Sequence, residues 1–298
     1  MSSGVNEIMD MLYGFTVDDN GNKAKTISIL NGYVSTSMID HSHYLGIKED
    51  GRVNLVTLTR EFTSVESLFK LEGGDGLSVM GNDNYVVVSK KEDTDYILIY
   101  KIPVRKSDTL GVKLTLFNRG KLSKINLGKI FIDYKMCITD NYVFVIGDVV
   151  DDGVVSTRIC IVNMETGRVT TNKSLGHRYT GMAVCHGDGD TVWIVGGKDR
   201  KGNVSPSVEK YVIKSNQAVM FTPLLDRFIC WSNVTITYKD KTLYILSDDG
   251  IYMLKDWKYS YVGPITEGIQ VNDSDIVIDK DVFIYHKKDT KLYMLDNL

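Results

Sequence analysis

The stretch Val192–Ile213, VWIVGGKDRKGNVSPSVEKYVI, decides how the rest of the sequence is interpreted. It holds two apolar runs separated by a glycine pair, Gly196 and Gly197, and by a polar segment that contains the turn-forming residues Gly202 and Pro206. Short apolar runs bounded by glycine, proline and polar residues are typical of β-strands joined by turns. The stretch therefore predicts two neighbouring strands, and the fold depends on whether similar pairs recur.

Runs like VWIVGG do recur along the whole chain. They begin on average about every 48 residues, within the range of the four-stranded blades of a β-propeller. Most follow another apolar strand that ends in a polar turn, and each precedes a third strand; a fourth, more polar strand follows in most units. We therefore predict an all-β fold, a single six-bladed β-propeller with four-stranded blades. The six runs start at Tyr44 (YLGI), Tyr85 (YVVV), Tyr142 (YVFVIG), Val192 (VWIVGG), Leu243 (LYIL) and Val282 (VFIY).

The two ends of the chain supply complementary pieces of one blade. The last unit stops after its third strand, KLYMLDNL, whereas KAKTISILNG (Lys23–Gly32) is a strand with no unit of its own. Because a propeller must join its ends or leave exposed strand edges, we expect Lys23–Gly32 to complete the last blade. The chain then divides into a leader, residues 1–22, and a propeller, residues 23–298. The Asp-Asn-Gly turn of the leader predicts an extra outer strand.

The segment HRYTGMAV…VWIVGGKDRKGNVSPSVEKYVI (His177–Ile213) resembles a kelch repeat. It has a small-residue strand, an apolar strand that ends in Gly-Gly, a long polar loop and a VEKY strand. The resemblance is partial over YVFVIGD…TRICIVNMETG (Tyr142–Gly167) and is limited to the apolar pattern elsewhere. It implies that the loops before the first strand and after the second strand of each blade ring one mouth of the central channel, where kelch-like domains commonly bind peptides.

Candidate binding residues follow from these positions, and the arginine, tyrosine and tryptophan among them are typical of interface hot spots. Two arginines at one mouth could hold a carboxylate, so we expect an acidic segment in a protein or peptide partner. By position, the resemblance to a kelch repeat implies these binding residues: Arg178, Tyr179, Lys198, Arg200 and Asp148. The apolar pattern of the other units alone adds Tyr134, Trp231, Lys48, Lys90, Asp248 and His286.

Charge and cysteine usage exclude several kinds of partner. The net charge is −3, and 35 basic and 38 acidic residues are interspersed, which favours neither nucleic acid nor an anionic membrane. No apolar run approaches the length of a membrane span, and the first residues lack the basic start of a secretory signal. The four cysteines form no C-x-x-C pair and indicate buried free thiols in a reducing compartment: Cys137, Cys160, Cys185 and Cys230. We expect a monomeric cytoplasmic protein.

Two other classes of function compete with a non-catalytic binding module. One is a propeller enzyme of the glycosidase or lyase type that acts on a sugar or sugar acid; the other is a structural or assembly protein of a larger complex, including a viral one. We expect no cofactor and no metal, because His177 and His186 lack metal-site spacing. Residues that an enzyme could use are the acids Asp148, Asp151 and Asp152 and the tryptophans Trp193, Trp231 and Trp257.

Overall fold

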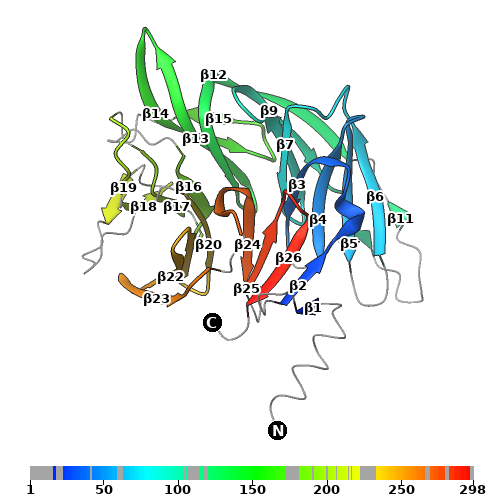
Figure 1. Cartoon of the computed structure of the whole chain (residues 1–298). Coiled ribbons are helices and arrows are strands. Elements are labelled where there is room, and N and C mark those ends of the chain that lie inside the picture. Colours follow the sequence, from blue (N-terminus) through cyan, green and yellow to red (C-terminus); the bar gives the residue numbers. More distant parts are fainter. Residues whose placement is uncertain are drawn as a thin grey trace.

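The structure, a computed structural model, consists almost entirely of β-strands (Figure 1). It describes residues 16–17, 23–40, 42–58, 63–103, 105–106, 115–116, 120–171, 181–189, 191–198, 201–205, 207–213, 215, 217–221, 233–265, 269–278 and 282–295. Helical structure within these ranges is limited to two single 3-10 turns, Ser28–Leu30 and Val271–Asp273. None of the helices in this part of the chain is long and apolar enough to cross a membrane. The prediction of an all-β fold is confirmed.

Four antiparallel sheets form separate blades in a propeller-like arrangement (Figure 1). The first contains β3 (Tyr33–Met38), β4 (His43–Lys48), β5 (Arg52–Leu58) and β6 (Thr63–Lys70). The second contains β16 (Ala183–His186), β17 (Thr191–Val195), β18 (Val208–Val212) and β19 (Gln217–Phe221). The third contains β20 (Val234–Lys239), β21 (Thr242–Ser247), β22 (Gly250–Lys255) and β23 (Lys258–Gly263). The fourth has five strands in the order β1 (Thr16–Val17), β2 (Lys23–Thr26), β26 (Lys291–Leu295), β25 (Val282–His286) and β24 (Ser274–Ile278).

A seven-stranded sheet departs from the predicted pattern of separate four-stranded units. Its strands are β7 (Leu77–Gly81), β8 (Tyr85–Lys90), β9 (Thr94–Lys101), β12 (Lys121–Ile138), β13 (Tyr142–Asp151), β14 (Val154–Asn163) and β15 (Val169–Thr171). The long strand β12 pairs with β9 through its first part and with β13 through its second part. No proline interrupts β12, so one continuous strand joins two units that the sequence pattern separates. A further two-stranded ribbon, β10 (Arg105–Lys106) and β11 (Thr115–Leu116), stands apart.

The opening stretch forms the predicted strand pair. Val192 of β17 pairs with Tyr211 of β18, and Val195 pairs with Val208. Gly196 and Gly197, which end the apolar run, have φ angles of +69° and +92°. Residues other than glycine rarely adopt these angles, so the glycine pair is required where the chain leaves the strand.

The hydrophobic core is divided into clusters that lie between neighbouring sheets. In β13, Val143 and Val145 pack toward β8 and β9, whereas Phe144 and Ile146 pack toward β17. The second strand of a unit is thus covered on both faces. This explains why the run YVFVIG is continuously apolar instead of alternating between apolar and polar residues.

The first and last parts of the chain meet in the five-stranded sheet. β2 pairs with β26, as predicted for Lys23–Gly32, although the strand ends at Thr26, and β1 adds an outer strand beside β2. The Ile27 amide donates to the Thr290 carbonyl at 2.8 Å. The Tyr285 hydroxyl donates to Thr36 Oγ1 at 3.0 Å, which joins this sheet to the first four-stranded sheet.

Candidate functional site

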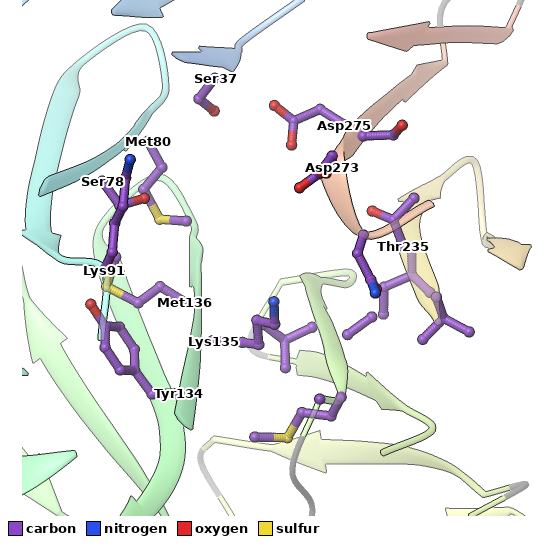
Figure 2. A pocket seen from close by; sticks show the side chains of 18 of the residues that line it. Ser37, Ser78, Met80, Lys91, Tyr134, Lys135, Met136, Thr235, Asp273 and Asp275 are labelled. Atoms are coloured by element: carbon purple, nitrogen blue, oxygen red, sulfur yellow. The ribbon is translucent and has the colours of Figure 1, made fainter. Parts of the chain in front are cut away.

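A polar pocket of about 720 Å³ lies where the first strands of the sheets converge (Figure 2). Its walls come from β3, β7, β12, β16, β20 and β24, together with residues that follow β8, β17 and β25. Because strands from five different sheets surround this one space, the space lies at the axis around which the sheets are arranged. The volume falls within the range of small-molecule and peptide sites. We call this space the axial pocket.

A β-bulge in β12 directs two side chains into the axial pocket. The register of β12 against β13 shifts between Ile132 and Lys135, and Asp133 has a φ angle of +47°. Bulges of this kind re-aim the side chains beside them. Tyr134 and Lys135 both line the pocket as a result (Figure 2). The Tyr134 hydroxyl donates to the backbone carbonyl of Lys90.

Gly147 of β13 allows this bulge to lie close to its neighbouring strand. A Cβ atom on Gly147 would lie 2.5 Å from the Cβ and 2.8 Å from the Cα of Tyr134. Real Cβ atoms essentially never approach other carbon atoms so closely, and here the obstacle is the backbone of the bulge. The glycine that ends the run YVFVIG therefore supports the geometry of the pocket wall.

Lysines outnumber acidic residues in the lining. Lys287 Nζ lies 2.7 Å from Asp275 Oδ1, so this pair is neutral overall. Lys91 Nζ donates to the Val34 carbonyl at 2.8 Å, a contact that leaves its charge uncompensated. The charged residues of the lining are Lys90, Lys91, Lys135, Lys198, Lys287, Asp133, Asp273 and Asp275.

Lys135 has the most exceptional environment of these lysines. Its ammonium forms neither an ion pair nor a hydrogen bond with any residue that the structure describes. Lys135 is exposed by its accessible surface, but the pocket walls surround its ammonium with protein atoms. The partial loss of solvent around the ammonium, and the nearby charge of Lys287, lower the pKa of Lys135, while Asp133 and Asp273 act in the opposite direction. A carboxylate bound beside Lys135 would stabilise its charged form.

Three of the predicted site residues, Lys90, Tyr134 and Lys198, line the axial pocket. Two others lie outside its lining. The Lys48 ammonium lies over the Tyr33 ring, 5.2 Å from its centre. Asp248 Oδ2 accepts a hydrogen bond of 2.7 Å from the side-chain amide of a lining residue, Asn233. Asp248 therefore belongs to the margin of the site.

The interpretation of Asp148 and His286 as exposed mouth residues is wrong. β13 continues through Asp148 to Asp151, and the fully buried Asp148 carboxylate accepts a hydrogen bond of 2.7 Å from Thr157 Oγ1. His286 is 5% exposed and holds Asp289 Oδ1 at 2.6 Å from its Nδ1. The error has one cause: these strands continue past the positions at which the apolar pattern ends.

Four predicted residues lie outside the described residues: Arg178, Tyr179, Arg200 and Trp231. Their neighbours Gly181, Lys198 and Asn233 line the axial pocket. The pocket also contains charged residues that the sequence pattern missed. Three of them directly follow a predicted residue, and in two of these pairs, at Lys90 and at Tyr134, both neighbours line the pocket. The three are Lys91, Lys135 and Lys287, which follow Lys90, Tyr134 and His286.

The residues considered for catalysis or metal binding do not assemble at this pocket. Asp151 lies at the end of β13, where Lys129 and Arg158 each approach its carboxylate to 2.6 Å. The ring centres of Trp193 and Trp257 lie 5.9 Å apart, but Trp193 is buried in the core between β17 and β20. Over the part of the chain that the structure covers, no group of three histidine, cysteine, aspartate or glutamate side chains is placed to hold a metal ion.

Comparisons with known proteins support the fold. No family model and no curated protein matches the chain. A solved structure described as that of YjhT superposes with a TM-score of 0.58, covering 87% of this chain and 92% of that chain at 10% sequence identity. A likeness at this identity shows the fold alone. Together with the arrangement of the sheets, it shows that the chain is a β-propeller-like protein.

Proposed function

We propose that this chain is a six-bladed, kelch-like β-propeller that binds a protein or peptide at the axial pocket and performs no chemistry of its own. In a six-bladed arrangement, the first part of β12 belongs to one blade with β7–β9, and its second part belongs to the next blade with β13–β15. Two observations support this assignment. The core cluster of Val87 and Ile97 with Val145 and Cys160 packs the two halves against each other, as neighbouring blades would pack. Every other cluster likewise joins two consecutive four-stranded sets.

The observation that carries the proposed function is the axial pocket with the unpartnered Lys135 in its wall. Lys135 forms no ion pair with a described residue, although Asp133 and Asp273 lie near enough to favour its charge, and a ligand carboxylate at hydrogen-bond distance would stabilise that charge further. Lys91 and Lys198 add positive charge to the same lining. These charges favour an acidic segment of a partner, the class of ligand that the sequence predicts.

The two competing functions receive less support. An enzyme of the glycosidase type needs a pair of carboxylates at the substrate, one of them free to act as an acid. Asp275 is engaged by Lys287 and also accepts the Met38 amide at 3.0 Å, which suits a structural role. The other two lining carboxylates, Asp133 and Asp273, belong to different elements, the β12 bulge and the turn before β24. An assembly role would use outer strands or edges instead of the axial pocket. Cytoplasmic location stays part of the proposal, and the free thiols of Cys137 and Cys160 are consistent with it.

Selection from a random peptide library displayed on phage tests the proposal. We expect the immobilised protein to enrich peptides with acidic residues. A selected peptide should bind the Lys135→Met variant about tenfold or more weakly, since a charge-assisted anchor contributes roughly 1.4 kcal/mol or more. Lys255→Met, at an exposed position at the end of β22 outside the pocket lining, is the matched control and should bind as wild type does. Equal affinity of both variants and wild type would overturn the axial pocket as the binding site.

A further inference from the structure

The charges of the axial pocket are separated between its walls. Figure 2 shows Lys91 and Tyr134 on one wall and Asp273 on the wall across from them, with Lys135 between. Lys91 and Lys135 come from the segments after β8 and at the β12 bulge, whereas Asp273 precedes β24. Asp133 lies beside Lys135 on the bulge, and Lys287 pairs with Asp275 on the other side, so the remaining basic residues Lys91 and Lys135 lie across from Asp273.

Asp273 is the acidic counterpart of Lys135. It belongs to the 3-10 turn Val271–Asp273, where its backbone amide donates to Gln270 and its carbonyl accepts from Lys287. Its carboxylate has no hydrogen bond or ion pair with a described residue. Asp275, two residues later, differs because Lys287 neutralises it at 2.7 Å. The Asp273 carboxylate is thus available to a cationic group of a ligand.

We infer that the axial pocket recognises a segment that carries an acidic and a basic side chain together, with the carboxylate at Lys135 and the cation at Asp273. This inference rests on the proposed function and specifies the chemistry of its ligand. A purely acidic ligand that engages Lys135 would compete with Asp273 for this lysine and would be repelled by the Asp273 carboxylate. A segment with both charges satisfies both walls, and like-charge repulsion then disfavours ligands with the opposite arrangement.

Four capped tripeptides that differ chiefly in charge are suitable probes. They are acetyl-Glu-Gly-Lys-amide, acetyl-Glu-Gly-Gln-amide, acetyl-Gln-Gly-Lys-amide and acetyl-Gln-Gly-Gln-amide, titrated against the full chain and followed by NMR chemical shifts. We expect the bipolar peptide to bind about tenfold more tightly than the acidic one, and the neutral peptide to bind weakest. Asp273→Asn should remove the advantage of the bipolar peptide and leave affinity for the acidic peptide equal or higher. Asp240→Asn, in an exposed turn outside the pocket lining, is the control and should change neither affinity.

The outcomes separate the two proposals. If the acidic and bipolar peptides bind equally well, and both lose affinity in Lys135→Gln, the bipolar ligand is refuted while the acidic binding site stands. If neither peptide binds more tightly than the neutral one, both proposals for this pocket are overturned. If the bipolar peptide loses its advantage in Asp273→Asn and both acidic peptides weaken in Lys135→Gln, both proposals hold. Thermal unfolding of each variant establishes that the fold is intact.

Discussion

The contact between the first and last sheets depends on Leu30, and replacing it tests how the ring is closed. Leu30 is 1% exposed and packs with Tyr44 of the first sheet and with Phe283, Tyr285 and Met294 of the last. Leu30→Ala removes a buried isobutyl group and leaves a cavity, a change that costs about 2–5 kcal/mol. A domain has only about 5–15 kcal/mol of total stability. The variant should therefore unfold at a clearly lower urea concentration than wild type.

The assay is equilibrium unfolding in urea followed by circular dichroism, with Ser28→Ala as the control. Ser28 belongs to the same 3-10 turn as Leu30, but its side chain is exposed, so its loss should change stability by no more than about 0.5 kcal/mol. Equal unfolding midpoints for Leu30→Ala and wild type would refute the reasoning. They would show that the ends of the chain do not depend on this packing.

Three further predictions concern the pocket wall and the thiols. Gly147→Ala should destabilise the fold by about 1–3 kcal/mol, because its Cβ would lie 2.5 Å from that of Tyr134; an unchanged unfolding midpoint in urea would contradict the role of this glycine. Burial raises the pKa of the Cys137 thiol, and that of Cys160 to about 11, so both should react slowly with Ellman's reagent at pH 8 until the protein is unfolded; rapid labelling of native protein would argue against this burial. Burial and a neighbouring lysine lower the pKa of Lys135. Affinity for an acidic peptide should therefore be highest below this pKa and should fall as the pH rises through it. The fall should occur at a lower pH than for an ordinary lysine. Lys135→Arg stays charged and should abolish the fall, and an undiminished fall in this variant would assign the titration to another group.

The strands were predictable because their sequences record burial on two faces. Runs such as Val192–Val195 are continuously apolar, and both neighbouring sheets cover them. The pairing of β2 with β26 was also predictable, since Lys23–Gly32 was a strand without a unit and the last unit lacked a fourth strand. Sequence patterns carry this information because they reflect which side chains avoid water.

The site was predictable only in part, because it depends on details that no apolar pattern records. The bulge at Asp133 changes which residues of β12 face the axis, so Lys135 joins Tyr134 in the lining. Asp148 is buried because β13 extends four residues beyond Gly147, where the strand pairs with β14 and Val149 enters the core. The joining of two units through β12 was likewise missed, because the apolar pattern does not record that one strand runs from Lys121 to Ile138 without a turn.

A crystal structure of the protein with a library-selected acidic peptide tests the central claim most directly. The peptide should occupy the axial pocket, with a carboxylate oxygen within about 3.2 Å of Lys135 Nζ. The walls around it should be those that contain Tyr134, Lys198 and Asp273. A peptide bound along an outer strand or at the opposite mouth, with the axial pocket filled only by water, would contradict the claim.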